Sequence, residues 1–330
     1  MSKPKRVHLK FVGLQPRTLR AYRQALSSFL KYIKRQSVQS LSSSALDQCL
    51  AEFINHAFQE GDPISYAGHL LSAIKRFHPE LRLKLPRASQ YYRNWAKSYT
   101  PVRALPASWE LVEAMISLSF DAKLPRLGLL LGLGFHCMLR TSEMMLLSKA
   151  HILLHPNAAS LSVVLPHGKT SEGNPQVLQV DDPHLVALAQ FYLQGMKKQA
   201  LLWSSGPFHF RETFDLLLMK LCFKSKSYLP YSLRRGGATW FYQHTLSLDA
   251  TVTRGRWSCS KTARQYIDEG TAQLAHLTWT DKQVKLVRKW RLKGAKLRLR
   301  QTKKKMDLTC SRLGPRVFFC PHPLLHNWFD

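Results

Sequence analysis

The sequence predicts a mainly α-helical protein with a small antiparallel β-sheet, organised as an all-helical N-terminal domain followed by a mixed α/β domain. Three observations predict this class. Apolar residues recur at helical spacing through most of the chain, a proline-containing stretch at 97–107 interrupts that spacing, and a pair of segments within 161–180 has the pattern of a β-hairpin. The chain has 330 residues, 45% hydrophobic and 11% aromatic, which is enough for two domains with hydrophobic cores.

The charge balance predicts a polyanionic partner. Lys and Arg number 49 against 20 Asp and Glu, a formal net charge of +29. Nucleic acid is the leading partner, because neutralising phosphates with Lys and Arg releases condensed counterions. An anionic membrane is the alternative. The longest apolar runs, such as 127–135, are too short to span a bilayer, and the N-terminus lacks the pattern of a signal peptide, so we expect a soluble intracellular protein.

The N-terminal region is predicted to be a basic arm, residues 1–13, followed by a helical bundle, residues 14–96. Apolar residues recur at helical spacing around 22–33, 46–58 and 70–77. Ten basic residues precede Asp47, the first acidic residue, so this bundle is expected to contact the polyanion. The candidate contacts on the first helix are Arg23, Lys31, Lys34 and Arg35.

A second domain is predicted at 108–280, after the linker at 97–107. Ser108 is a suitable N-cap for its first helix. The apolar stretch 127–147 is expected to be helical, with Arg140 and Glu143 embedded in it. Because they are three residues apart, they are expected to form an ion pair on one helical face, and this pairing would explain charged residues in an apolar segment.

A β-hairpin is predicted where residues 161–165 form a β-branched run and residues 176–180 alternate polar and apolar. The connection at 167–175 is rich in Gly, Ser and Asn and carries Lys169 at its tip. Helical patterns resume at 185–192, at 214–223 and after Ser232. With so few strand signals, the sheet is expected to be small.

The C-terminal region, 281–330, is predicted to begin as a basic helix or tail. Twelve basic residues lie between 282 and 305, and no acidic residue occurs among them. This segment is interpreted as a DNA contact, a nuclear import signal or a solvated helix face, with the first two together favoured. The cysteines and histidines at 310, 320, 322 and 326 fit no common zinc-finger spacing, so no metal site is predicted. Residues 307–330 receive no assigned role.

Four motifs carry the candidate chemistry, and their order along the chain is informative. They are Arg140-Thr141-Ser142-Glu143, Lys169 in the hairpin, Tyr231-Ser232-Leu233-Arg234-Arg235-Gly236-Gly237-Ala238-Thr239, and Gly255-Arg256-Trp257 leading to Tyr266. Together they resemble the tyrosine recombinase, or phage integrase, family in both order and spacing, over roughly residues 10 to 275. The block 232–239 is most similar to recombinases of eukaryotic DIRS-like and Crypton-like mobile elements.

The resemblance implies a helical core-binding domain, a recombinase-type catalytic domain and a set of site residues. The implied catalytic residues are Arg140, Lys169, Tyr231, Arg234, Trp257 and Tyr266, with Glu143 orienting Arg140 and Arg235 contacting DNA. The two catalytic arginines would bind the scissile phosphate, because planar guanidinium groups stay charged and offer several donors. Tyr266 would attack phosphorus, leaving a 3′-phosphotyrosyl link, and Lys169 would protonate the leaving oxygen.

Tyr231 occupies a position where the family most often has His. A phenol donates a hydrogen bond but is a poor proton shuttle near neutral pH, given its ordinary pKa of about 10. This substitution keeps a second hypothesis open, a catalytically decayed DNA-binding protein with the same fold. A type IB topoisomerase, which shares the chemistry, ranks third.

The resemblance also implies the partners and the energetics. Double-stranded DNA is the expected substrate, held as two duplexes by a homotetramer. No cofactor is expected, because the phosphotyrosine keeps the bond energy and rejoining then requires neither ATP nor a metal ion. The protein is expected to be nuclear if its source is eukaryotic, and otherwise to lie in the cytoplasm or nucleoid.

Overall fold

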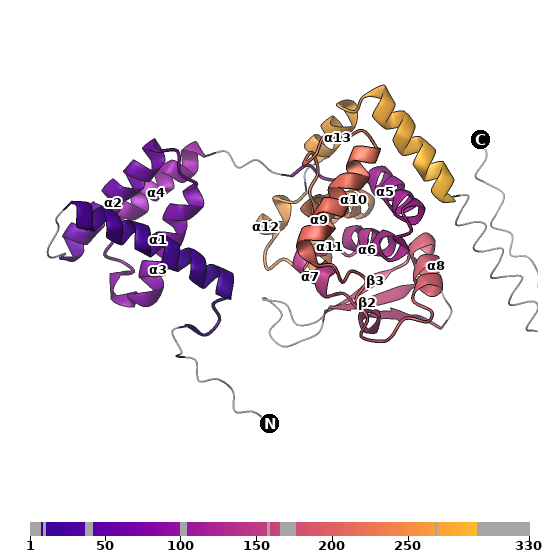
Figure 1. Ribbon diagram of the computed structural model, residues 1–330, viewed down its shortest axis with the longest axis horizontal. Coiled ribbons are helices and arrows are strands. Elements are labelled where there is room, and N and C mark those ends of the chain that lie inside the picture. The colour runs from indigo at the N-terminus through magenta and orange to yellow at the C-terminus, as the bar shows by residue number, and fades with distance from the viewer. Residues whose placement is uncertain are drawn as a thin grey trace, which may run out of the picture. The chain divides into compact units, whose positions relative to one another are not determined.

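The computed structural model describes residues 8, 11–36, 42–99, 104–156, 159–165, 176–267 and 269–295. The chain divides into two units, 1–102 and 103–330 (Figure 1). The described elements are mainly helices with a three-stranded antiparallel sheet, which confirms the predicted fold class. Among these residues, no helix is both long and apolar enough to cross a membrane.

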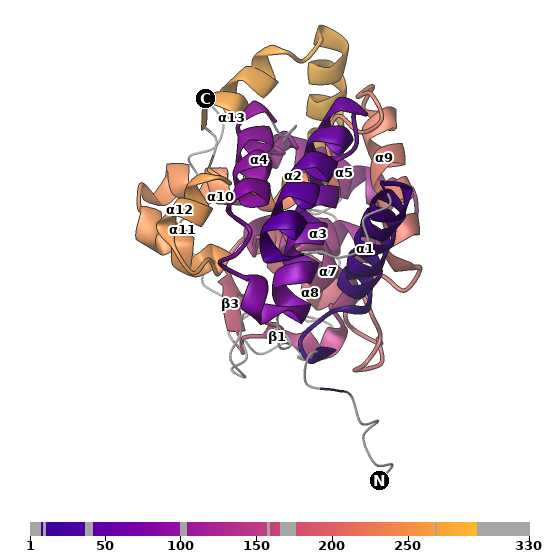
Figure 2. The ribbon, with the colours of Figure 1, turned by 90° about the vertical axis from the view of Figure 1, so that its left-hand side faces the viewer.

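In the first unit, the described residues form the helices α1 to α4 and a short 3₁₀ turn at Pro79–Leu81. Figures 1 and 2 show these helices from two directions. The helices are α1 (Pro16–Arg35), α2 (Ser43–Gln59), α3 (Ile64–Phe77) and α4 (Pro86–Ser98). Their apolar faces meet in a core that includes Phe29, Leu50 and Leu70. Asp47, the first acidic residue, is buried there, and its carboxylate accepts the backbone N–H groups of Arg87 and Ala88 at 3.0 and 2.9 Å. It therefore holds the start of α4 against α2.

The second unit is built around α10, which packs against α5, α6 and α11 (Figure 1). Its helices are α5 (Trp109–Asp121), α6 (Pro125–His136), α7 (Thr141–Leu146), α8 (Pro183–Tyr192), α9 (Gly206–Lys220), α10 (Pro230–Thr245), α11 (Leu248–Gly255), α12 (Ser260–Arg264) and α13 (Glu269–Leu277), and residues 281–295 form a further helix. Ser108 is the N-cap of α5 and accepts the backbone N–H of Leu111 at 3.3 Å, as predicted.

The sheet has the strand order β1-β2-β3 and is antiparallel throughout. Its strands are β1 (Ile152–Leu154), β2 (Leu161–Leu165) and β3 (Gln176–Val180). The pairing of β2 with β3, which sets Val163 opposite Leu178, confirms the predicted hairpin. Sequence reasoning missed β1, which has only three residues and too little alternation to be recognised.

The expected continuous helix over 127–147 is wrong, because the chain reverses between α6 and α7. Met138 adopts the left-handed conformation with φ 47°, and the N–H groups of Met138 and Leu139 bond back to Phe135 and Gly134 at 3.0 Å. This pattern is a Schellman motif, which ends a helix. Arg140 consequently lies just before α7 as its N-cap residue.

Two adjacent glycines allow α10 to approach its neighbours closely. A Cβ atom on Gly236 would overlap the backbone carbonyl oxygen of Ala107, and a Cβ atom on Gly237 would overlap that of Phe135. Backbone atoms cannot move aside as a flexible side chain does. The Gly-Gly pair in the 231–239 motif therefore sets the distance between α10, the end of α6 and the segment before α5.

We expect Gly237→Ala to lower the free energy of unfolding by about 3 kcal/mol, because overpacking against backbone forces the helices apart. Urea unfolding followed by circular dichroism measures this. Gly270→Ala is the matched control, since none of the described atoms comes within 4 Å of a Cβ at that position, and it should change stability by less than about 1 kcal/mol. Equal unfolding midpoints for the two variants would contradict the packing argument.

Candidate active site

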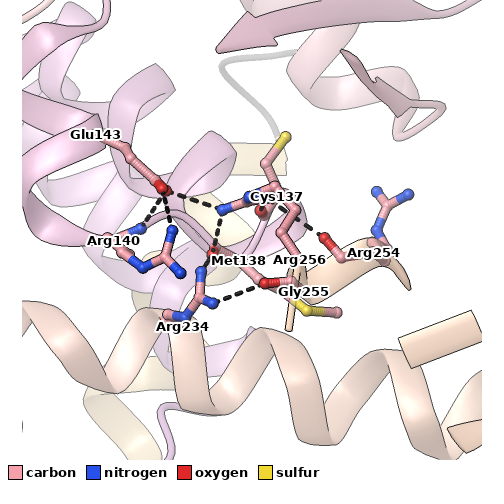
Figure 3. Close-up of polar contacts among 8 residues, drawn as sticks. All are labelled: Cys137, Met138, Arg140, Glu143, Arg234, Arg254, Gly255 and Arg256. Carbon is pink, nitrogen blue, oxygen red and sulfur yellow. Dashed lines mark hydrogen bonds and ion pairs between the residues drawn. The ribbon is translucent and has the colours of Figure 1, made fainter. Parts of the chain in front are cut away.

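The Glu143 carboxylate joins two arginines that are far apart in the sequence (Figure 3). Its Oε1 accepts from Arg140 Nη1 at 2.7 Å, and its Oε2 accepts from the backbone N–H of Arg140 at 2.7 Å and from Arg256 Nη2 at 2.8 Å. Burial alone would raise the pKa of Glu143, but Arg256 and the hydrogen bonds from Arg140 outweigh it, so the pKa lies below its ordinary value. Glu143 is therefore a carboxylate at neutral pH.

Arg234 extends from α10 into the same cluster and is fully buried. Its Nη1 donates to the carbonyl oxygen of Met138, and its Nη2 donates to that of Gly255 at 2.7 Å (Figure 3). Burial lowers the pKa of Arg234 to about 10, helped by the positive charges of Arg256 and Arg140. The guanidinium nevertheless remains charged at neutral pH.

Aromatic rings cover the Arg234 guanidinium. Its Cζ lies 4.9 Å from the centroid of the Trp257 ring and 5.3 Å from that of Tyr266. The centroids of these two rings are 4.7 Å apart, and Trp257 packs so closely on Gly255 that a Cβ there would overlap the indole. Tyr231, at the start of α10, also lies beside Tyr266, with ring centroids 5.6 Å apart. Cation–π contact therefore links the buried arginine to a half-buried tyrosine.

The two phenols of this cluster have opposite pKa shifts. Burial raises the pKa of Tyr231, and its hydrogen bond to Tyr266 raises it further. Burial would also raise the pKa of Tyr266, but the hydrogen bond from Tyr231 and the positive charge of Arg234 lower it, and the net pKa lies below 10.0. Tyr231 is thus a neutral donor, and Tyr266 is the phenol that ionises first.

The structure brings together five of the six residues implied as catalytic: Arg140, Tyr231, Arg234, Trp257 and Tyr266. The sixth, Lys169, lies outside the described residues. The implied orienting contact from Glu143 to Arg140 is present, although it forms at the start of α7 rather than along a continuous helix.

The candidate DNA contacts differ in their exposure. Arg23, Lys31, Lys34 and Arg35 all lie exposed on α1. Arg235, in contrast, is only 3% exposed, because α10 is enclosed by its neighbours at this position. Its predicted role as a surface contact with DNA does not agree with this burial.

Sequence reasoning did not select Arg256, whose side chain is only 4% exposed and donates to Glu143 and to the carbonyl oxygens of Cys137 and Met138. A signal was available in the composition of the motifs. The motifs contain the cations Arg140, Lys169, Arg234, Arg235 and Arg256, whereas Glu143 is the one acidic residue within them. Because a buried carboxylate readily pairs with more than one guanidinium, the arginine next to Trp257 was a reasonable candidate partner.

Comparisons with known proteins identify the fold. No protein-family model matches the sequence, and the search of curated proteins finds no match. Among solved structures, a Tn1549 transposon integrase in complex with transposon right-end DNA aligns with a TM-score of 0.57 at 10% identity, over 81% of this chain and 95% of that one. The chain has the fold of the tyrosine recombinases. A lambda integrase dimer bound to a COC′ core site aligns on the same fold with a TM-score of 0.52 at 13% identity, over 78% of this chain and 73% of that one.

Proposed function

We propose that this chain is a site-specific DNA recombinase or integrase that cleaves and rejoins DNA strands through a 3′-phosphotyrosyl intermediate, and that a mobile element encodes it. One observation carries the proposal. A tyrosine whose pKa is lowered, Tyr266, lies against the guanidinium of Arg234 inside a cluster of arginines. The tyrosine recombinase fold and the similarity to integrases bound to DNA support the same conclusion.

The electrostatics of the site favour a phosphodiester ligand. Three guanidinium groups, those of Arg140, Arg234 and Arg256, lie in this cluster, and the Glu143 carboxylate bonds to Arg140 and Arg256 and acts on Arg234 only through its charge. A phosphate anion would supply the negative charge that this cluster lacks. The same guanidinium groups would stabilise the additional negative charge that develops on the phosphate oxygens in the transition state. The Arg140 side chain is 36% exposed, so a phosphate would meet it first. Access to Arg234 requires the ring of Tyr266 to move aside.

Cleavage would then follow from these positions. The Tyr266 oxygen bonds to phosphorus, the bond from phosphorus to the 5′ oxygen breaks, and its electron pair remains on that oxygen. Lys169 supplies the proton to the 5′ oxygen, as the family resemblance implies. The Tyr266 proton passes to solvent, because the raised pKa of Tyr231 keeps that phenol protonated, so it acts as a donor and cannot take up the proton. Attack by the 5′ hydroxyl of another strand reverses these steps and rejoins DNA without ATP.

The partner in this proposal is double-stranded DNA, bound as two duplexes by a homotetramer. The exposed basic face of α1 supports contact of the first unit with the phosphate backbone. On the helix 281–295, Lys282, Lys285, Arg288 and Lys289 are exposed as well, whereas Arg291 pairs with Glu113 at 2.8 Å. We propose a eukaryotic DIRS-like or Crypton-like element as the source, and hence action in the nucleus.

Covalent trapping tests the proposed function. Nicked duplexes taken from the DNA that flanks this gene release a short fragment after cleavage, so the protein remains attached to the strand. We expect an SDS-resistant protein–DNA band that carries the label when the label is on the fragment ending in the 3′ phosphate. Plasmid relaxation without pairing of sites would favour a topoisomerase instead. Salt-sensitive binding with no covalent band, over a selected pool of binding sites, would favour the decayed DNA-binding protein.

The opposite pKa shifts predict a specific pH dependence. The reactive form of Tyr266 is the phenolate, so the single-turnover cleavage rate should rise with pH and level off at a pH below 10.0. Tyr231→Phe removes a hydrogen bond that lowers the pKa of Tyr266, so the inflection should move to higher pH. At neutral pH the rate should fall about tenfold for each unit of that shift. An unchanged inflection in this variant would contradict the role of Tyr231.

A further inference from the structure

We infer that Arg256 is a positioning residue for the strand-cleavage reaction, acting through Glu143 and the turn at 137–138 to present Arg140 and Arg234 to the phosphate. This inference rests on the proposed function. Arg256 follows α11 in the left-handed conformation, with φ 58°, and this backbone geometry directs the chain from α11 to Trp257. Its side chain is only 4% exposed, so it acts on protein groups and not on solvent.

The Arg256 guanidinium holds the reversal between α6 and α7 (Figure 3). Its Nη1 donates to the carbonyl oxygen of Cys137 at 2.8 Å, and its Nη2 donates to that of Met138 at 3.1 Å. The Met138 oxygen also accepts from Arg234. One carbonyl thus connects the two guanidinium groups, and both fix the left-handed turn that places Arg140 at the start of α7.

Arg256 also determines how much negative charge reaches Arg140. The Glu143 carboxylate is divided between them, with Oε1 on Arg140 Nη1 at 2.7 Å and Oε2 on Arg256 Nη2 at 2.8 Å. Without Arg256, the whole carboxylate charge would act on Arg140 and compete with a phosphate for it. Arg256 therefore keeps Arg140 oriented by Glu143 without neutralising it.

The chain offers a matched control in Arg254, two residues earlier. Arg254 also donates to backbone carbonyls, with Nε to His136 at 3.0 Å and Nη2 to Gln179 at 2.9 Å. Within the described part of the chain, its side chain bonds to neither Glu143 nor Met138. Arg254→Gln therefore removes a similar number of carbonyl contacts beside the same turn while leaving the arrangement around Glu143 intact.

The experiment compares wild type, Arg256→Gln, Arg256→Lys and Arg254→Gln on a nicked duplex that wild type cleaves. Three quantities are measured for each: the single-turnover cleavage rate at saturating protein, the Kd for the duplex, and the urea unfolding midpoint. For Arg256→Gln we expect the rate to fall about 100-fold with Kd changed less than about threefold, because misplaced catalytic groups slow chemistry more than binding. Arg256→Lys should recover part of the rate, and Arg254→Gln should stay within about threefold of wild type.

A double-mutant cycle with Glu143→Gln separates positioning from simple structural support. If Arg256 acts through the Glu143 charge, Arg256→Gln should lower the cleavage rate by a much smaller factor in the Glu143→Gln background than in wild type. A cleavage rate for Arg256→Gln within threefold of wild type would overturn the inference. So would additive effects of the two substitutions on the cleavage rate. Parallel decreases in cleavage rate, duplex affinity and urea unfolding midpoint would overturn it as well. If Arg256→Gln does not fold, Arg256→Lys decides by the same criteria. Absence of cleavage by wild type at selected sites would instead overturn the proposed function.

Discussion

Tyr266→Phe is expected to abolish the covalent protein–DNA adduct, lowering strand cleavage by at least about 10⁴-fold, while duplex binding stays within about twofold of wild type. The substitution removes the attacking oxygen but keeps the ring. That ring packs against Trp257 at 4.7 Å and against the Arg234 guanidinium at 5.3 Å, and Phe preserves both contacts. Trapping on nicked duplexes, with binding measured in parallel by gel shift, distinguishes loss of chemistry from loss of affinity.

Tyr91→Phe is a suitable control for this experiment, because Tyr91 is an exposed tyrosine in α4 of the other unit. An adduct that persists in Tyr266→Phe would show that another residue is the nucleophile. Tyr231 would then be the first residue to examine, since its ring centroid lies 5.6 Å from that of Tyr266. If the adduct is lost in Tyr231→Phe but persists in Tyr266→Phe, Tyr231 is the nucleophile and Tyr266 is the hydrogen-bond donor.

Arg234→Lys is expected to reduce strand cleavage about 100- to 1000-fold, although the positive charge is retained. The guanidinium places two nitrogens on carbonyl oxygens of separate segments, Met138 and Gly255, and a single ammonium cannot keep both contacts and also face a phosphate. Losing one of these buried hydrogen bonds from a charged donor should also lower the free energy of unfolding by about 1–3 kcal/mol. Single-turnover cleavage and urea unfolding measure the two effects.

Arg211→Lys provides the control for Arg234→Lys, because Arg211 is exposed on α9 and makes no contact with this cluster in the described part of the chain. It should change neither quantity beyond experimental error. If Arg234→Lys cleaves DNA at the same rate as wild type, a positive charge is sufficient at this position. In that case, the fork geometry of Arg234 would have a structural role without a catalytic one.

Local sequence patterns predicted the elements that depend on near neighbours. Helical periodicity predicted several helices of each unit, such as α1, α2 and α3 in the first and α5, α8 and α9 in the second, and alternation predicted the pairing of β2 with β3. The reversal at Met138 escaped prediction, because a non-glycine residue in the left-handed conformation leaves no compositional sign at a helix end. The burial of Arg235 was not predicted either, because the sequence of a basic motif does not show whether an arginine next to Arg234 faces solvent or the core.

The sequence by itself determined the fold class, because helical periodicity and strand alternation depend on near neighbours along the chain. Its resemblance to the tyrosine recombinases, carried by the order and spacing of the motifs, implied the five residues that lie together in the candidate site. Tertiary structure alone decided how those residues are connected. Arg256 and Glu143 are 113 positions apart, and Arg234 and Met138 are 96 apart. Contacts across such separations depend on how α7, α10 and α11 pack. That packing requires Gly236 and Gly237, because the backbone of neighbouring segments lies where a Cβ atom would be, and this proximity is visible only in the tertiary structure.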